Sequence, residues 1–396
     1  MKKFLAATAL TAIASSAFAE AHDGPVKLGI LIGFTGPIES LAEAMGRGAE
    51  LAIQEVNDAG GILEGRMVEG VRADTGCIDN GLATSNAERL VAEGIAGLIG
   101  GDCSGVTGAI LQSVAIPQGM VMISPSATSP ALTTVEDNDL FYRTAPSDAR
   151  EGEIMAEILM ERGFESVALT YTNNDYGKGL ADAFQSSYEA MGGEVTISAA
   201  HEDGKADYTA EVGALASAGG DILVVAGYLD QGGLGIIRGS LDSGAYDQFV
   251  LPGGMIGDSI VENLGTDLDG SFGQIAGSGN EGATTLGTMG EEAGFDARSP
   301  YAPESYDAAA LFMLAMEKAG STDPAEYNAA ILEVANAPGT QFFPGQLAEA
   351  LEAIRAGEDI DYVGGSDVEL VGPGEAAGSY REVEVQNGAF ETIGYR

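Results

Sequence analysis

The chain has 396 residues, and its 60 Asp and Glu residues far outnumber its 18 Lys and Arg residues, which gives a formal net charge of −42 at pH 7. A surface this rich in carboxylates repels phosphate groups, so nucleic acid and anionic lipid are excluded as partners. The hydrophobic share of 45% is enough to build cores, and the length exceeds what one core usually organises, so we expect two domains. The charge excess also indicates a saline habitat, because salt screens repulsion between carboxylates.

The N-terminus has the layout of a secretory signal peptide. Met1-Lys2-Lys3 is basic, residues 4–13 are apolar, and small residues end at Ala17-Phe18-Ala19. We therefore expect residues 1–19 to be removed on export to the periplasm, although an ordinary helix is the alternative. The apolar stretch is shorter than the ~20 residues that span a bilayer, and no cysteine follows the cleavage site, so we expect no anchor.

Short β-rich runs and amphipathic helical stretches alternate from Val26 onward, which is typical of parallel sheets flanked by helices. Apolar residues spaced three or four apart between Leu41 and Val56 predict one helical face, which ends at Gly60-Gly61. Strands are predicted at 26–32, 96–99, 120–124, 166–171, 221–226 and 249–251. Helices are predicted at 151–162, 176–191, 206–217, 303–319 and 324–335. The sequence therefore predicts a doubly wound α/β protein.

This series breaks in two places. A turn-rich segment at Thr144–Asp148 follows a strand and precedes a fresh βα series, and that series ends near Ala276–Gly279. We interpret both places as crossings between domains.

The two cysteines, Cys77 and Cys103, are predicted to form a disulfide, because an exported chain folds in an oxidising compartment. Two free buried thiols remain the alternative, since the sequence does not show whether their Cα atoms lie within ~7 Å.

The sequence offers little material for catalysis or metal binding. His22 and His201 are its only histidines, too few for a zinc cluster or a serine–histidine–aspartate site. Gly233–Gly239 resembles a dinucleotide fingerprint, but it has one residue too many before its last glycine and lies within a helical stretch. We therefore expect a protein that is not an enzyme and that has no cofactor, metal or catalytic residue.

Small polar residues follow several predicted strands, at the edge where α/β sheets bind ligands. Gly100–Gly105 places Ser104 at the start of a helix, and Ser124–Pro130 follows the next strand. Together these turns are suited to a carboxylate, although each alone is also a simple helix N-cap. Tyr176 and Tyr228 occupy similar positions in the second half and offer rings that stack on a ligand, or that merely pack.

As a set, these turns resemble the branched-chain amino-acid class of type I periplasmic binding proteins, the receptors of ABC importers. The resemblance runs from Gly29–Pro37 to Gly378–Glu382 and is most specific at the paired cysteines with Ser104, at Ser126-Ala127-Thr128 and at Asp175-Tyr176-Gly177. It implies a monomer of two Rossmann-like lobes, with three hinge crossings and a ligand clamped between the lobes as in a Venus flytrap. The implied limits are 20–146 with 278–379, and 147–277 with 380–396.

The resemblance also implies roles for single residues. Ser104 and Thr128 would hold a ligand carboxylate, while the Ser126 carbonyl and the Thr128 hydroxyl would meet an α-ammonium group. Ala127 belongs to the same turn. Tyr176 and Tyr228 would close from the other lobe.

The chain departs from the family pattern after the strand 249–251. The family commonly has an acidic residue for the ammonium group there, whereas this chain has Pro252-Gly253-Gly254-Met255. A buried ammonium group without a carboxylate costs several kcal/mol. Either Glu39, Asp258 or Glu304 substitutes, or the ligand is not an ordinary α-amino acid. Met255 would make the pocket softer and more apolar.

The sequence thus predicts a periplasmic solute-binding protein that captures a small amino acid-like ligand, branched-chain or related, for the membrane permease of an ABC importer. The alternatives are an amide or an aromatic or aliphatic carboxylate as ligand, a sensory ligand-binding module, or an unrecognised exported enzyme.

Overall fold

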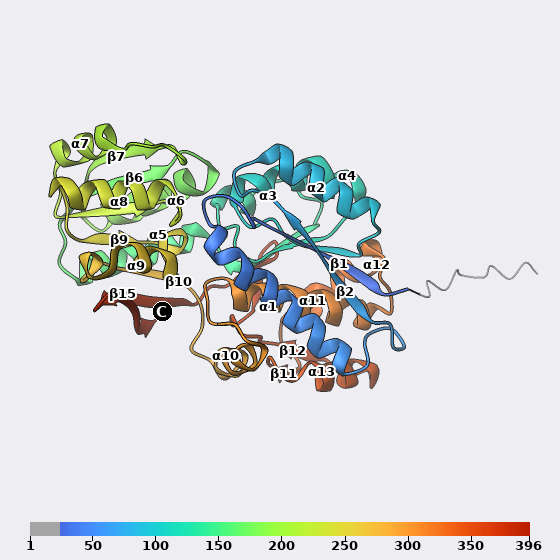
Figure 1. Cartoon of the computed structure of the whole chain (residues 1–396). Helices are drawn as coiled ribbons and strands as arrows, with labels where there is room; N and C mark the ends of the chain where they lie inside the picture. The colour runs from blue at the N-terminus through green and yellow to red at the C-terminus, as the bar shows by residue number, and fades with distance from the viewer. Residues whose placement is uncertain (1–23) are drawn as a thin grey trace, which may run out of the picture.

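The computed structural model describes residues 24–396 and shows two lobes, each built around a seven-stranded sheet (Figure 1). The predicted signal peptide and His22 lie outside these residues. Among the residues that are described, no helix combines the length and the apolar character needed to cross a bilayer.

The first sheet has the order β13-β14-β5-β4-β3-β1-β2, and its five strands from β1 to β5 are parallel. Its strands are β1 (Val26–Ile32), β2 (Val68–Asp74), β3 (Gly97–Gly100), β4 (Met122–Ser124), β5 (Phe141–Pro146), β13 (Leu370–Val371) and β14 (Glu375–Ala376). The second sheet repeats this arrangement as β16-β15-β10-β9-β8-β6-β7, with two antiparallel strands at one edge. Its strands are β6 (Ser166–Thr172), β7 (Glu194–His201), β8 (Ile222–Ala226), β9 (Phe249–Leu251), β10 (Phe272–Ala276), β15 (Tyr380–Gln386) and β16 (Ala389–Tyr395).

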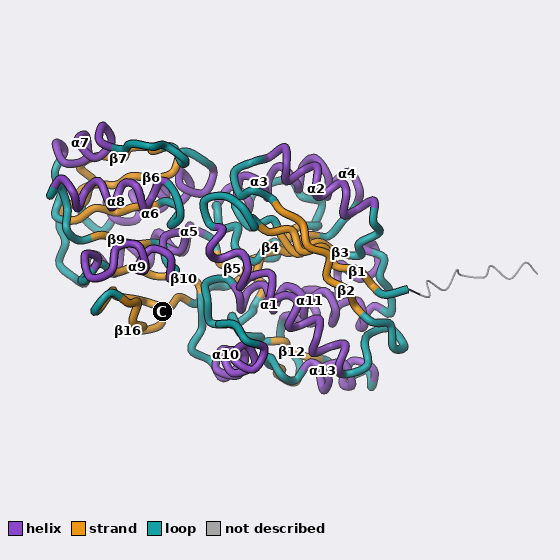
Figure 2. The backbone as a smooth tube through the Cα atoms, in the orientation of Figure 1, coloured by secondary structure: helices purple, strands orange, loops and turns teal. Residues whose placement is uncertain are grey.

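Helices cover both faces of each sheet (Figure 2). Those of the first lobe are α1 (Glu39–Asp58), α2 (Asn80–Ala92), α3 (Ser104–Ile110) with a π-helical turn at Leu111–Ala115, α4 (Ile116–Gln118), a 3-10 turn at Pro130–Thr133, α10 (Glu281–Ala293), α11 (Ala302–Ala319), α12 (Pro324–Ala335) and α13 (Leu347–Arg355), with the small strands β11 (Thr340–Phe342) and β12 (Ile360–Tyr362). Those of the second lobe are α5 (Asp148–Glu161), α6 (Asp175–Ala190), α7 (Thr209–Ala218), α8 (Gly232–Ser243) and α9 (Asp258–Leu264), with 3-10 turns at Gly253–Met255 and Gly265–Leu268.

The cores follow from the residue pattern. β8 is a fully buried run of apolar residues, and β1 is almost entirely buried and apolar except for Lys27, as expected of strands with helices on both faces. α11 is buried on nearly every side and packs against α1, α12 and α13, so it forms the centre of the first lobe. Gly233–Gly239 lies inside α8, as the sequence predicted for a false dinucleotide motif.

The predicted fold class is confirmed: two doubly wound lobes with parallel central sheets. The chain passes from one sheet to the other after β5, after β10 and between β14 and β15. One detail of the prediction is wrong, because Thr144–Pro146 belongs to β5 rather than to a turn. We propose that the lobes have the limits 20–146 with 278–379, and 147–277 with 380–396, in agreement with these three crossings.

Candidate functional site

Within each lobe the parallel strands follow the order 2-1-3-4-5, which reverses direction between the first and third strands. In open α/β sheets, ligands bind beyond the carboxyl ends of the strands at such a reversal. The reversal lies between β1 and β3 in the first lobe and between β6 and β8 in the second. We therefore expect a ligand site at the turns that follow these strands.

In the first lobe, the turns after β3 and β4 are tied together. Ser104 begins α3, and its Oγ accepts a hydrogen bond of 3.1 Å from the amide of Ser129. The Ser126 hydroxyl donates to the carbonyl of Asp102 at 3.0 Å. Because the Ser104 oxygen acts as the acceptor, its hydroxyl proton remains able to donate to a ligand.

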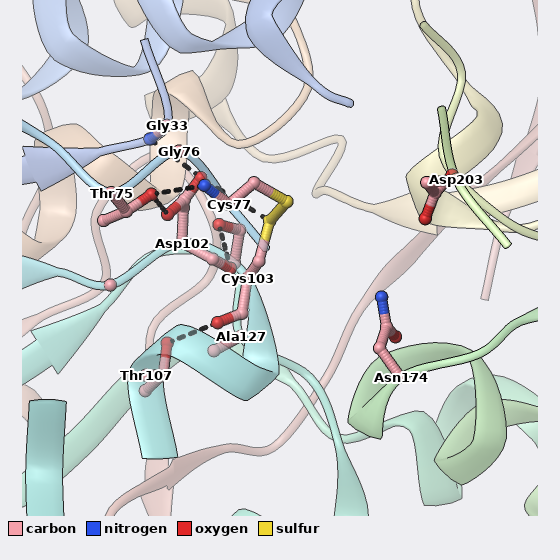
Figure 3. The surroundings of a disulfide bond; sticks show 12 residues. Gly33, Thr75, Gly76, Cys77, Asp102, Cys103, Thr107, Ala127, Asn174 and Asp203 are labelled. Atoms are coloured by element: carbon pink, nitrogen blue, oxygen red, sulfur yellow. Dashed lines mark hydrogen bonds between the residues drawn. A yellow bond between two sulfur atoms is a disulfide. The ribbon is translucent and has the colours of Figure 1, made fainter. Parts of the chain in front are cut away.

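Asp102 joins the turns that follow three strands (Figure 3). Its carboxylate accepts from the amide of Gly33 at 2.9 Å and from the hydroxyl of Thr75 at 2.7 Å. Burial raises the pKa of Asp102, and these hydrogen bonds partly oppose the rise. Its carboxylate therefore holds the turns after β1, β2 and β3 together.

The predicted disulfide between Cys77 and Cys103 is confirmed, with Cα atoms 5.2 Å apart. It links the turn after β2 to the residue that precedes Ser104. The Thr107 hydroxyl also donates to the Cys103 carbonyl at 2.9 Å. The disulfide and this hydrogen bond thus fix Cys103, the residue that precedes Ser104.

The second lobe contributes stacked tyrosines. Tyr176 lies in the first turn of α6 and Tyr228 follows β8; their ring centroids are 5.1 Å apart with an interplanar angle of 19°. The amide of Gly254 donates to the Tyr176 hydroxyl at 3.1 Å. Burial, followed by the nearby carboxylates of Glu151 and Asp148, raises the pKa of Tyr176 well above its usual value, so the hydroxyl stays protonated.

Both groups of residues line one cavity between the lobes. It is bordered by Ile38, Leu41, Asp102, Cys103, Ser104, Ser126, Thr128, Tyr176, Tyr228, Gly254 and Tyr301. Its volume is about 20 Å³, roughly the space of one water molecule.

The lobes also contact each other at the edge of this cavity. The Asp230 amide donates to the Pro37 carbonyl at 3.1 Å, and the Ser40 amide donates to the Asp230 carboxylate at 2.9 Å. The structure is therefore a closed form, and the lobes must separate to admit even a small amino acid.

Of the residues predicted to bind ligand, the structure brings Ser104, Ser126, Thr128, Tyr176 and Tyr228 to the cavity wall. Ala127 lies behind the wall, where its amide donates to Ser124 Oγ at 3.0 Å.

The four candidate substitutes and neighbours do not reach the cavity wall. Glu39 and Asp258 are exposed in the first turns of α1 and α9, and Met255 is buried against Gly233. Glu304 is fully buried, but it borders a different pocket with Arg381. Burial raises its pKa to about 8. None of the three acidic residues therefore supplies the cavity with a carboxylate in this form.

Sequence reasoning missed Tyr301, Ile38 and Leu41 as wall residues. Tyr301 immediately precedes α11 with a φ of 62°, far along the chain from the other wall residues, and no local pattern marks it. The sequence predicts that Leu41 lies on the buried face of α1. It does lie there, and it also borders the cavity.

Comparison with known proteins agrees with this geometry. The model of the periplasmic binding protein family matches residues 25–348. A Leu/Ile/Val-binding protein homolog of Brucella melitensis biotype 1 is 30% identical over 335 residues, covering 83% of this chain and 86% of the relative. A chemotactic signal transduction system substrate-binding protein of Halobacterium salinarum is 27% identical, covering 93% and 89%.

A solved structure of an ABC transporter solute-binding protein from R. palustris in complex with benzoate has the same fold. Its TM-score is 0.76 at 20% identity, over 94% of this chain and 96% of the other. With the two-lobed fold and a family match over most of its length, the chain belongs to the periplasmic binding protein family.

Proposed function

We propose that the protein binds a small amino acid-like ligand between its lobes and presents it to the membrane permease of an ABC importer. The proposal includes export to the periplasm with loss of residues 1–19, action as a monomer, and no chemical change of the ligand. The family, which consists of binding proteins, and the relative named for Leu, Ile and Val support it.

One observation carries the proposal: the hydroxyl-bearing turns after β3 and β4 of one sheet face stacked tyrosines at the reversal point of the other. We assign Ser104 and Thr128 to the ligand carboxylate, and the Ser126 carbonyl with the Thr128 hydroxyl to the ammonium group. Tyr176 and Tyr228 cover the ligand when the lobes close. Ligand then selects the closed population through contacts made only in that state.

Calorimetry with valine, leucine, isoleucine, threonine, alanine and benzoate tests this function. We expect an amino acid to bind and to compact the protein in small-angle X-ray scattering. Thr128→Val should weaken binding about tenfold or more, because it removes a hydroxyl without changing the side-chain shape. Thr134→Val, at an exposed threonine outside the cavity, is the matched control. Failure of every amino acid to bind would refute the proposal.

An aromatic or aliphatic carboxylate is the second candidate ligand. It is favoured by the turn Pro252–Met255, which has no acidic residue, and by the benzoate bound to a protein of the same fold. Tighter binding of benzoate than of any amino acid would establish it.

A further inference from the structure

Two buried carboxyl groups lie at the start of α5, just after the first crossing between the lobes. Asp148 is 0% exposed and Glu151 is 2% exposed. Residues three apart on a helix share a face, so the two carboxyl groups are neighbours. In a chain with 60 acidic residues most carboxylates are solvated, and such a buried pair requires an explanation.

The pair lies directly behind the cavity wall and contacts both lobes. The amide of Asp148 donates to the Thr128 carbonyl at 2.8 Å, in the hydroxyl-bearing turn of the first lobe. Glu151 Oε1 accepts from the amide of Gly253 at 2.9 Å, next to Gly254 in the cavity wall of the second lobe. It also accepts from Gln274 Nε2 at 2.9 Å.

The Asp148 carboxylate lacks partners. Within residues 24–396, neither of its oxygens has a hydrogen bond of good geometry, although the Thr128 hydroxyl lies close enough to lower its pKa. Arg143 is the buried cation beside it, but its guanidinium donates to the Ala127 and Ser129 carbonyls, to Thr133 and to Glu375. Arg143 Nε also has no partner among these residues, so Arg143 lowers the pKa of Asp148 through its charge and without a hydrogen bond to either carboxylate oxygen. The Asp148 carboxylate therefore keeps acceptor capacity that no side chain uses.

The electrostatic surroundings are otherwise neutral phenols. The titratable side chains that face the pair are Arg143, Tyr176, Tyr228, Tyr301 and Tyr380. Burial raises the pKa of both carboxyl groups, and for Asp148 the neighbouring Glu151 raises it further. Two such groups are expected to hold one proton between them, since two adjacent buried charges repel each other.

The turn after β9, which contains Gly253, supplies no carboxyl group next to the pair. A Cβ atom placed on Gly253 would lie 2.4 Å from the Tyr301 hydroxyl and 3.7 Å from Glu151 Oε1. Tyr301 therefore leaves no room for a side chain at 253, and the carboxyl group nearest to this part of the wall belongs to Glu151.

We propose that Asp148 and Glu151 form a cation subsite that takes the primary ammonium group of the ligand in exchange for their shared proton, and that they share this group with the Ser126 carbonyl and the Thr128 hydroxyl assigned above. Before binding, the pair consists of one carboxylate and one carboxylic acid. Afterwards two carboxylates face one ammonium group, and the released proton goes to solvent. The subsite itself carries a net charge of −1 in both states, because the ammonium charge replaces the charge of the released proton, and the ligand carboxylate is held separately by the hydroxyls of Ser104 and Thr128. The inference rests on the proposed function and specifies its ligand as a primary amine.

Both carboxyl groups belong to α5, which contacts the turn of each lobe, because the Asp148 amide donates to the Thr128 carbonyl and Glu151 accepts from the Gly253 amide. The ligand ammonium group is held beside both turns by binding to the two carboxylates. It must donate hydrogen bonds to do so, which a trimethylated nitrogen cannot.

Calorimetry with three ligands of one skeleton tests the subsite: L-valine, isobutylamine, which lacks the carboxylate, and 3-methylbutanoate, which lacks the ammonium group. Measurements in phosphate and in Tris at pH 7 report proton release through the buffer-dependent enthalpy. For the wild type we expect proton release with valine and none with 3-methylbutanoate. Glu151→Gln should lose this release and bind valine about thirtyfold more weakly, with 3-methylbutanoate binding unchanged.

Glu151→Gln keeps a carbonyl acceptor for Gly253, and Asp148→Asn is the second variant. Glu153→Gln, at an exposed position of the same helix, is the control for charge removal and should behave as wild type. Valine binding without proton release and unchanged in both variants would overturn the subsite while leaving the proposed function intact. Wild-type binding of isobutylamine with proton release, without binding of any amino acid, would overturn the function and leave the subsite.

If the wild type bound N-trimethylvaline as tightly as valine, this result would also overturn the proposed subsite.

Discussion

Tyr228 matters because its ring covers the ligand only when the lobes are closed. In the closed form the ring is 4% exposed, stacked on Tyr176 and facing the first-lobe turns. Tyr228→Ala should weaken ligand affinity about tenfold or more, because a buried aromatic contact is lost from the closed state alone. Calorimetry and the radius of gyration with ligand report the two effects. Tyr395→Ala removes a tyrosine that is 53% exposed and should change neither. Unaltered affinity and compaction in Tyr228→Ala would mean that this ring is not a clamp.

Glu304 should make the stability of the protein depend on pH. Burial raises its pKa from 4.5 to about 8, and neither carboxylate oxygen has a hydrogen-bond partner in the described part of the chain. The folded state thus binds a proton that the unfolded state releases, so the unfolding free energy falls as pH rises from about 4.5 to 8. The unfolding free energy, measured by urea titration, should fall less steeply with pH for Glu304→Gln than for the wild type. The difference between the two falls should reach up to ~4 kcal/mol over this range.

His201 allows the two slopes to be separated. Burial lowers its pKa to about 4, so it removes stability as pH falls below 6.5, the opposite direction. Parallel curves for wild type and Glu304→Gln above pH 6.5 would contradict the role assigned to Glu304.

Single residues of the site were predictable where chemistry and position coincide. Ser104 and Thr128 follow predicted strands, and a hydroxyl in that position has few other uses than a cap or a ligand. Asp148 and Glu151 could not be singled out, because the sequence does not mark which of 60 acidic residues are buried. Their burial depends on α5 packing against α6 and β10 across the lobe.

At the scale of elements, the inner strands were predictable and the edges were not. β8 and β9 are continuous apolar runs buried on both faces, and β1 is interrupted only by the partly buried Lys27. β7 at the edge of its sheet is half exposed and polar, so its pattern resembles a loop. β5 is fully buried but contains Arg143, whose charge is satisfied by Glu375 on the distant strand β14. Such a partner is invisible in the local sequence.

The disulfide acts at the same scale, since it joins the turns after β2 and β3 over a separation of 26 residues. In the loop-entropy model, closing a loop of this length stabilises the fold by about 3.5 kcal/mol. Cys77→Ser with Cys103→Ser should lower the urea midpoint accordingly and weaken ligand binding, because Cys103 borders the cavity and precedes Ser104. A reductant should then lower the urea midpoint of the wild type and leave the midpoint of the double variant unchanged. Equal midpoints for the two proteins would show that the bond contributes nothing to stability.

For the whole molecule, the arrangement of the site follows from repetition of one topology. Both sheets use the same strand order, so both present their strand-end turns at a reversal point, and the three crossings turn these edges toward each other (Figure 1). The sequence predicted two βα series and therefore two such edges. It did not predict that the closed cavity would be as small as one water molecule, because that depends on how closely the lobes approach.

The charge of the whole molecule leads to a prediction about salt. Even if every Lys and Arg were paired, the excess of 42 negative charges would remain, and compaction brings these charges together. The Debye length falls from about 10 Å at 0.1 M to about 3 Å at 1 M, so sodium chloride should raise the urea midpoint at pH 7 with little change in slope. Screening saturates once the Debye length is shorter than the spacing between surface carboxylates, whereas exclusion of salt from apolar surface grows steadily with concentration. Most of the rise should therefore occur below about 0.5 M if repulsion is the cause. A midpoint that does not rise, or that rises linearly to several molar, would contradict adaptation of this surface to a saline habitat.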